Sequence, residues 1–311
     1  MKRESIVFGL LLLFFWLAWM SDSFVVKLLF YLEMLFLFIC SRIFKTNDAN
    51  CGEFRSVTSG RVGAYVINLD GAKDRWNFVE PSVTALGFAV ERVSAIDGKT
   101  LSPKEIESVA SAELYKFFFK MYPEEGTIGC ALSHEKAWRT FLESDNEFAI
   151  IFEDDVQFDP KKLREVIEFA LKEKDLWNIV NFETKHDGFP QRISKYFQEQ
   201  SLVVYLTNVT HAGCYLIDRR AAYELLRKFY PIKMPIDHYF TAAWEFDLKF
   251  VGVEPRIVFQ KFGDSHIKTS PAKKIRILFV IIANAIYLVQ RAVLHFAYNF
   301  LCLSYFRQRR T

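Results

Sequence analysis

The sequence lacks the cysteine patterns that hold small disulfide or zinc folds together. Its five cysteines stand far apart, at positions 40, 51, 130, 214 and 302, with no CxxC pair and no zinc spacing. An odd number of distant cysteines is typical of free thiols in a reducing compartment. Neither a disulfide framework nor a structural zinc site is therefore expected to organise this chain.

Internal repeats, low-complexity tracts and a large net charge are also absent. The formal net charge of the 311 residues is only +3, but it is unevenly spread. Residues 272–311 hold seven Lys/Arg and no acid, whereas residues 46–271 hold 28 basic and 34 acidic residues. A basic tail on a mildly acidic body favours an anionic membrane surface as a partner and argues against nucleic acid.

The amino-terminal hydrophobic run is short for a membrane span. Ile6–Met20 is fifteen uncharged residues, and a helix of that length rises roughly 22 Å against a hydrocarbon core of about 30 Å. A signal peptide is the alternative, but Ala18–Ser21 offers no small-x-small cleavage site, and a second apolar stretch, Phe24–Phe44, follows. We expect residues 1–45 to form a membrane-anchoring hairpin or long helix with both ends in the cytosol.

The carboxyl-terminal segment 272–311 shows the pattern of an amphipathic helix. On a helix its polar residues fall on one stripe of an apolar cylinder: Arg276, Asn284, Tyr287, Arg291, His295 and Asn299. That pattern predicts a basic helix lying in a membrane interface. Packing of the helix against the chain's own amino-terminal segment is the alternative.

The body, residues 46–271, begins with a strand–helix–strand pattern. Val62–Asp70 is apolar and β-branched, a helix is expected over about Trp76–Leu86, and Phe88–Val93 forms the next strand. This βαβ unit predicts an α/β fold with a mostly parallel central sheet. Further along, Ser102–Met121 is predicted as one amphipathic helix, Thr127 as the cap of the next, and residues 248–258 as a closing strand pair.

The most informative stretch is Phe148–Val156, where five apolar residues run into three consecutive carboxylates. The apolar run is typical of a strand buried on both faces, and the acids then fall at its carboxyl end, where open α/β sheets bind ligands. Three adjacent acids repel one another, so a divalent metal with oxygen ligands is predicted there. A solvated acidic turn before the helix that begins at Asp159-Pro160 is the alternative.

Polar residues also end the other predicted strands. Asn68 and Asp70 close the first strand, Asp97 follows the second, and Glu183 follows Trp177–Phe182. These side chains are therefore expected to share one edge of the sheet.

Seven short motifs occur in an order that resembles glycosyltransferase family 25. They are Val66–Asp70 with Asp74-Arg75, Ala95–Gly98, Gly129–His134, Glu153–Val156, Gly213-x-Tyr215–Ile217, Pro235-x-Asp237 and Ser265–Ile267. The resemblance covers about residues 62–270. One departure is visible: Trp76 stands where the family often has a second arginine, which removes a phosphate contact at that position.

The resemblance implies a GT-A-like fold, a UDP-sugar donor, an inverting transfer and a divalent metal, Mn²⁺ first. Glu153 and Asp155 are then the metal ligands, because strand alternation points them the same way, and Asp154 contacts the donor from elsewhere. The remaining donor-site residues that the resemblance implies are Asn68, Leu69, Arg75, Asp97, Ser133 and His134. An ordinary helix histidine is the alternative for His134.

An inverting transfer needs a base for the acceptor hydroxyl. Asp237 is the first candidate and Glu183 the second. The alternatives are a helix N-cap for Asp237 and a surface strand-end acid for Glu183. Thr210, Gly213 and Tyr215 are expected to line the acceptor side.

The sequence thus predicts a membrane-associated hexosyltransferase, galactose being the first choice of sugar, acting on a lipopolysaccharide, lipooligosaccharide or related lipid-linked glycan. Its catalytic domain would lie on the cytoplasmic side of a bacterial inner membrane. A non-catalytic membrane scaffold and a metal-dependent sugar-nucleotide hydrolase are the alternatives.

Overall fold

The computed structural model describes residues 55, 57–119, 122–185, 189–195, 197–261, 295–296 and 299–300. The predicted membrane segment 1–45, most of segment 272–311 and the motif Ser265–Ile267 lie outside these residues. The chain divides into the units Met1–Asp48 and Ala49–Thr311, and the description concerns the second unit alone.

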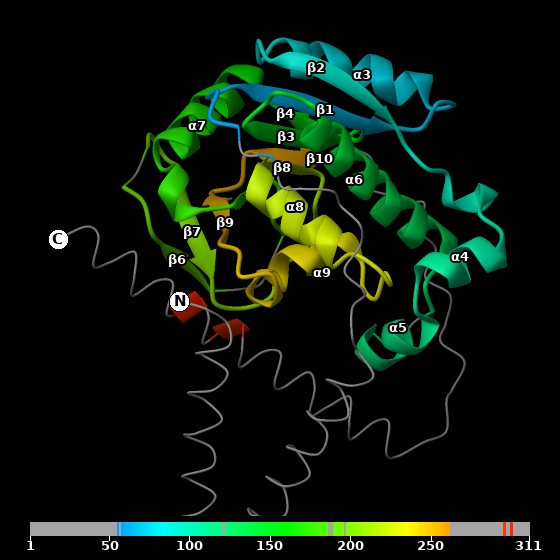
Figure 1. The fold of residues 1–311 in the computed structure, drawn as a ribbon. Helices are drawn as coiled ribbons and strands as arrows, with labels where there is room; N and C mark the ends of the chain where they lie inside the picture. The colour runs from blue at the N-terminus through cyan, green and yellow to red at the C-terminus, as the bar shows by residue number, and fades with distance from the viewer. Residues whose placement is uncertain are drawn as a thin grey trace, which may run out of the picture. The chain divides into compact units, whose positions relative to one another are not determined.

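An eight-stranded sheet forms the centre of the body (Figure 1), with strands in the order β2-β1-β3-β8-β5-β9-β7-β6. In that order the strands span Ala89–Ser94, Val62–Asn68, Phe148–Glu153, Cys214–Asp218, Ile179–Asn181, Phe250–Glu254, Ser201–Tyr205 and Pro190–Arg192. Neighbours pair parallel at β2-β1, β1-β3 and β5-β9 and antiparallel at the other four steps. Six of the eight strands consequently run in one direction, and only β8 and β7 oppose them.

Helices cover both faces of the sheet, because successive strand residues point to opposite sides. On β1, Tyr65 and Ile67 pack in one cluster with the helices α6 (Glu125–Glu143), α8 (Arg219–Arg227) and α9 (Ile236–Thr241). Ala64 and Val66 pack in the other with α3 (Lys73–Thr84) and α7 (Pro160–Lys172). The α/β class and the largely one-directional sheet are confirmed, while the narrower GT-A-like assignment stays a prediction.

The predicted helix over Ser102–Met121 is wrong in one respect, because the structure has two helices, α4 (Pro103–Val109) and α5 (Ala112–Phe119). Between them Ala110 forms a parallel bridge with Ile232. The Ser111 N–H donates to the Ile232 carbonyl at 3.0 Å, and the Ile232 N–H donates to the Val109 carbonyl at 2.8 Å. A distant segment thus takes backbone bonds that a continuous helix would use.

Two further boundaries differ from expectation. Helix α6 begins at Glu125 with Glu124 at its N-cap, so Thr127 lies inside the helix and is no cap. The expected strand pair 248–258 is divided between two sheets. β9 joins the central sheet, whereas β10 (Val258–Gln260) pairs antiparallel with β4 (Val156–Phe158), the strand that follows the acidic cluster. The short β4–β10 ribbon therefore anchors the chain directly after Asp155.

The start of α6 packs tightly against the loop that follows β2. A Cβ added to Gly98 would collide with the backbone carbonyl of Glu125, and one added to Gly129 would lie 2.6 Å from the Gly98 nitrogen. Only hydrogen fits at this close approach. The loop of Asp97 and the short 3₁₀ helix η1 (Gly98–Thr100) are held in place by this contact.

Part of the carboxyl-terminal polar stripe faces the protein. His295 is 2% exposed, and its ring nitrogens lie 2.8 Å from the Thr241 carbonyl and 3.1 Å from the Tyr205 carbonyl. Asn299 is buried beside it. For these two residues the predicted membrane-interface orientation is wrong, because carbonyls at the ends of α9 and β7 satisfy the imidazole. Within the described part of the chain, no helix combines the length and apolar character of a membrane span.

We predict that Gly98→Ala destabilises the fold by about 1–3 kcal/mol, the typical cost of overpacking. The added methyl forces α6 away from the loop of Asp97. Urea denaturation measures the free energy of unfolding. Gly71→Ala is the matched control, since a Cβ at Gly71 meets nothing within 4 Å. Equal stability of the two variants would contradict the close approach.

Candidate active site

The strand ends that the sequence predicts to share an edge do meet. In the parallel register Asn68 pairs with Ser94, and Ile67 pairs with Glu153, so β1, β2 and β3 end level. Because β8 runs the opposite way between β3 and β5, its beginning reaches the same edge. There the Gly213 carbonyl accepts from the Glu153 N–H at 2.8 Å, and the Gly213 N–H donates to the Glu183 carboxylate at 2.8 Å.

Asp154 is held by the first strand and the first helix. Its carboxylate accepts from Asn68 Nδ2 at 2.7 Å and from Arg75 Nη1 at 3.0 Å. Asn68 is itself fully engaged, since its amide also donates to the Ala72 carbonyl and its oxygen accepts from Arg92. Asp154 therefore has its partners on β1 and α3, and it holds the Arg75 guanidinium beside the cluster.

Glu153 ends a buried chain of hydrogen bonds. Trp138 Nε1 lies 2.8 Å from the Tyr215 hydroxyl, which lies 2.9 Å from His134 Nδ1, and His134 Nε2 lies 3.2 Å from the Glu153 carboxylate. An indole N–H only donates, so the Tyr215 oxygen accepts from it. At the other end of the chain of bonds, the His134 Nε2–H donates to the Glu153 carboxylate, which only accepts. Burial, the largest single influence, opposes the charge of Glu153, but the bond from His134 together with the electrostatic influence of His134, His211 and Arg75 outweighs it and lowers the pKa of Glu153.

Asp155 is the member of the triplet that has a buried oxygen, Oδ1, without a hydrogen-bond partner among the described residues. Burial, followed by the charge of Glu153, raises the pKa of Asp155 to about 7, although Arg75 opposes the shift. A buried carboxylate oxygen without a partner is costly, so this atom is suited to a cation or donor supplied by a ligand.

Glu183, His211 and Asp237 form a second group at this edge. Glu183 is 1% exposed, and its carboxylate accepts from the Gly213 N–H and from His211 Nδ1 at 2.9 Å. Asp237, in the first turn of α9, accepts from the His211 N–H at 3.2 Å. Burial raises the pKa of Glu183 against the bond from His211, and that same bond raises the pKa of His211. Neither acid has the surroundings of a solvated surface residue.

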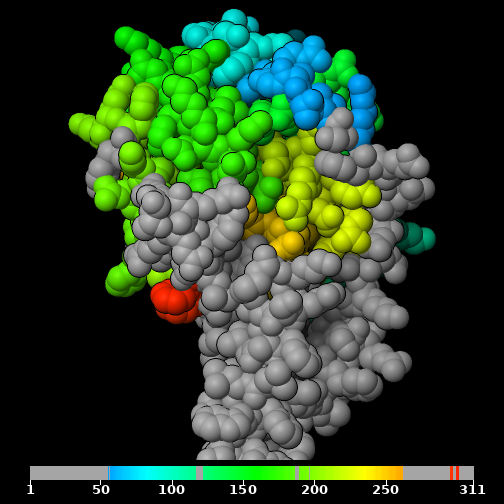
Figure 2. All heavy atoms as spheres, turned by 60° about the vertical axis from the view of Figure 1, so that its left-hand side comes forward, coloured from blue at the N-terminus to red at the C-terminus, as the bar shows by residue number. Residues whose placement is uncertain are grey.

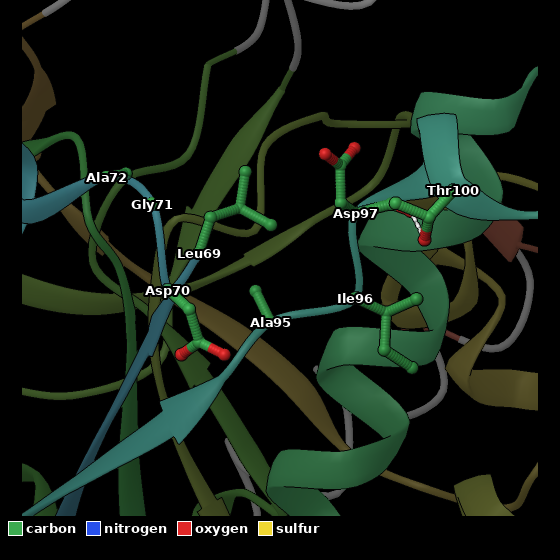
Figure 3. Close-up of a pocket in the computed structure, with 8 residues that line it drawn as sticks. All are labelled: Leu69, Asp70, Gly71, Ala72, Ala95, Ile96, Asp97 and Thr100. Carbon is green, nitrogen blue, oxygen red and sulfur yellow. Dashed lines mark hydrogen bonds between the residues drawn. The ribbon is translucent and has the colours of Figure 1, made fainter.

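A cavity of about 560 Å³ opens between the loops that follow β1 and β2. Its lining includes Leu69, Gly71, Ile96 and Asp97. Figure 3 shows the side chains of Leu69 and Asp97 on the same side of the loops, while Asp70 turns the opposite way. Ser133 supports this wall from α6, because its hydroxyl accepts from the Ile96 N–H at 2.8 Å. Leu69 and Asp97 therefore line the cavity, whereas Ser133 acts on it through the backbone.

The donor set at the edge fits a hard divalent ion better than a soft one. Cys130, His134 and Glu153 place ligand atoms within 4.8 Å of one another. However, burial raises the pKa of the Cys130 thiol well above its usual range, and nearby acids oppose the thiolate further. Metals bind the deprotonated thiolate. The carboxylates of Glu153 and Asp155, with the unsatisfied Oδ1 of Asp155, are the chemistry that Mg²⁺ or Mn²⁺ prefers.

The structure adds residues that the sequence pattern did not single out. His211 joins Glu183 to Asp237, and Trp138 anchors Tyr215. The expectation that Tyr215 lines the acceptor side is wrong, because its ring is fully buried against His134. Thr210 is exposed, and Gly213 is covered by Glu183. A histidine next to a strand start carries no local signal that a carboxylate from another strand will bind it.

Comparison with known proteins identifies the family to which the sequence is similar. A model described as glycosyltransferase family 25 (LPS biosynthesis protein) matches residues 62–240. A glycosyltransferase 25 family member of Anopheles gambiae is 26% identical over 188 residues, which are 58% of this chain and 31% of that protein. Procollagen galactosyltransferase 1 of Danio rerio is 23% identical over 215 residues, 63% of this chain and 35% of that protein.

The chain thus spans about a third of the length of these curated relatives. Among solved structures, the crystal structure of S. aureus TarS 1–349 aligns at a TM-score of 0.40 and 13% identity, covering 64% of this chain and 60% of that one.

We predict that Tyr215→Phe lowers the free energy of unfolding by at least about 1–3 kcal/mol, because the buried Trp138 Nε1 and His134 Nδ1 both lose their partner. Chemical denaturation provides the measurement. Tyr122→Phe is the control, since Tyr122 is 45% exposed and surface changes usually stay within about 0.5 kcal/mol. A Tyr215→Phe variant as stable as the wild type would show that the hydroxyl does not link the two side chains.

Proposed function

The chain belongs to glycosyltransferase family 25, and we propose that it transfers a hexose from a UDP-sugar to a lipid-linked glycan acceptor, inverting the anomeric centre. Membership agrees with the resemblance seen in the ordered motifs. Galactose is the first choice of sugar, because several relatives are named galactosyltransferases. The acceptor is lipopolysaccharide, lipooligosaccharide or a related glycan, in line with the description of the matching family.

The observation that carries the proposal is the unsatisfied Oδ1 of Asp155 beside Glu153, at an edge that also bears a cavity. A UDP-sugar combines a nucleoside, which needs a cavity, with a diphosphate, which needs positive charge. Asp97 uses one carboxylate oxygen to cap η1 and offers the other to a ribose or base. The Leu69 side chain, 37% exposed, supplies an apolar surface for the nucleoside.

Charge neutralisation is the chemical task of this edge, because the leaving group is a nucleoside diphosphate. Glu153 and Asp155 would hold a divalent ion, Mn²⁺ first, and that ion would offset the negative charge of the diphosphate. Arg75, fixed by Asp154, supplies a further positive charge near Asp155. His134 keeps Glu153 ionised and oriented, since it donates to the carboxylate from a fully buried position.

We also propose that the protein acts at an anionic membrane surface, on the cytoplasmic face of a bacterial inner membrane. Two aromatic side chains near the carboxyl terminus support this. Phe296 and Phe300 are 48% and 50% exposed, and their rings stack at 6.0 Å. The exposed part of the described residues 295–296 and 299–300 is seen in red at the surface in Figure 2. Buried His295 fixes this pair to the body, so the exposed rings are available to a lipid surface.

The test is transfer by the purified full chain from UDP-galactose, with Mn²⁺, to a truncated core glycolipid. We expect Asp155→Asn to lower transfer at least about 100-fold, the usual cost of removing a group that stabilises transition-state charge. Treatment of the wild type with EDTA should do the same. Asp159→Asn is the matched control four residues on. Asp159 caps α7, and asparagine caps as well as aspartate, so transfer should stay within a few-fold of wild type.

Other outcomes separate the alternatives. UDP release that needs no acceptor would identify a sugar-nucleotide hydrolase, and donor binding without turnover would identify a scaffold. Transfer by Asp155→Asn within a few-fold of wild type would overturn the metal assignment.

A further inference from the structure

His211 is held at three points, by α9, by the end of β5 and by the segment just after β5. Its backbone N–H donates to Asp237 in α9 at 3.2 Å, and its carbonyl accepts from Asn181 Nδ2, at the end of β5, at 2.8 Å. Its ring Nδ1 lies 2.9 Å from the carboxylate of Glu183, just past β5. The contacts fix both the backbone and the ring.

The backbone of His211 is also in an unfavourable conformation. Its φ is +79°, in the left-handed region that residues other than glycine seldom adopt. Such strain costs roughly 1–3 kcal/mol, persists only where surrounding contacts impose it, and is concentrated at functional sites. Here the contacts to Asp237 and Asn181 impose it. The conformation brings the ring onto Glu183.

The ring of His211 remains accessible while its partner does not. The side chain of His211 is 25% exposed, whereas that of Glu183 is 1% exposed. Glu183 receives a donor on each oxygen, from Gly213 and from His211. The Gly213 N–H can only donate, and a carboxylate only accepts, so Nδ1 carries the proton of a neutral His211. Nε2 is then a lone-pair acceptor, and it has no hydrogen-bond partner among the described residues.

We infer that His211 is the catalytic base of the transfer, with Glu183 and Asp237 as the residues that position it. The inference rests on the proposed glycosyltransferase function. In the step, the acceptor hydroxyl oxygen bonds to the anomeric carbon of the donor sugar, and the bond from that carbon to the diphosphate oxygen breaks. The diphosphate leaves with the electron pair, and the hydroxyl proton moves to Nε2 of His211. The resulting imidazolium is stabilised by the Glu183 carboxylate.

In this arrangement Glu183 and Asp237, the two acids predicted as bases, have a positioning role instead. Glu183 lies too deep to meet an acceptor hydroxyl, and it fixes the tautomer and charge of the histidine instead. Asp237 holds the backbone of the same residue. Gly213 places the start of β8 between Glu153 and Glu183, bonding to the first through its carbonyl and the second through its N–H. The base thus stands one strand away from the proposed metal ligands.

His211→Asn is the sharpest test. Asparagine tolerates a positive φ, and its amide nitrogen can replace Nδ1 as the donor to Glu183, but it has no counterpart of Nε2. With UDP-galactose, Mn²⁺ and the truncated core glycolipid, we expect kcat to fall about 100-fold to 10,000-fold, the range for a lost general base. The Kd for UDP-galactose should stay within about threefold. Gln198→Asn, at another left-handed position (φ 53°), is the control.

Glu183→Gln tests the positioning role. In this variant the Gly213 N–H donates to the glutamine oxygen, so the amide NH₂ of the glutamine faces His211 Nδ1. Because the NH₂ group donates, Nδ1 must accept, and the proton of a neutral His211 then lies on Nε2. Glutamine has nearly the same shape as glutamate, so the packing at position 183 is kept. Nε2 can no longer accept the hydroxyl proton, however, and kcat should fall as far as in His211→Asn. Because the two residues act as one unit, the double variant should be no slower than either single variant.

The pH profile gives a readout that a structural role would not change. The charged groups that act on His211 are Glu183, Asp237 and Lys185, and Glu153 also interacts with it electrostatically; the bond to Glu183 raises the pKa of His211 above its ordinary value of 6.5. Wild-type kcat should therefore rise with pH through a limb above 6.5, as the imidazolium loses its proton. This limb should be missing in both single variants.

A kcat of His211→Asn within about fivefold of wild type would overturn the inference while leaving the proposed function standing. Loss of UDP-galactose binding together with transfer would also overturn it, because His211 would then only hold the site together. A wild-type protein that binds no UDP-sugar and transfers none would instead reject the proposed function, and the inference with it.

Discussion

Like charge at one partly buried sheet edge is the constraint on which the rest of the site depends. The charges of Glu153, Asp154 and Glu183 all act on Asp155 there, and each of those three acids has a hydrogen-bond partner of its own. His134 donates to Glu153, His211 to Glu183, and Asn68 with Arg75 occupy Asp154. Asp155 alone keeps a buried oxygen without a partner among the described residues. The protein thus pairs the other acids with its own donors and leaves the Asp155 carboxylate for a ligand.

The sheet topology is what brings these groups together. Parallel pairing of β1 with β2 and β3 sets three strand ends level, and the reversed β8 brings Gly213, the residue just before it, to the same edge. A side chain at Gly213 would overlap the Glu183 carboxylate. On the other flank, the contact of Gly98 with α6 sets the loop of Asp97. The positions of the cavity, the acidic cluster and His211 are therefore consequences of one arrangement of strands.

The sequence predicted those features that depend on local pattern. The apolar run before Glu153 identified a strand buried on both faces, and the strand-end acids identified the edge. Features set by distant contacts were not predictable in this way. The break between α4 and α5 depends on Ile232, the burial of Tyr215 depends on Trp138 and His134, and the role of His211 depends on Glu183. The orientation of His295 likewise depends on carbonyls of β7 and α9.

The central claim is that this edge binds a nucleoside diphosphate through its acids. A crystal structure of the protein with UDP and Mn²⁺ tests it most directly, because the anomalous signal of manganese locates the ion independently of the ligand density. The account predicts manganese on the carboxylates of Glu153 and Asp155, with the uracil or ribose against Leu69 and Asp97. Manganese or UDP bound at another part of the molecule, with Asp155 uninvolved, would contradict it.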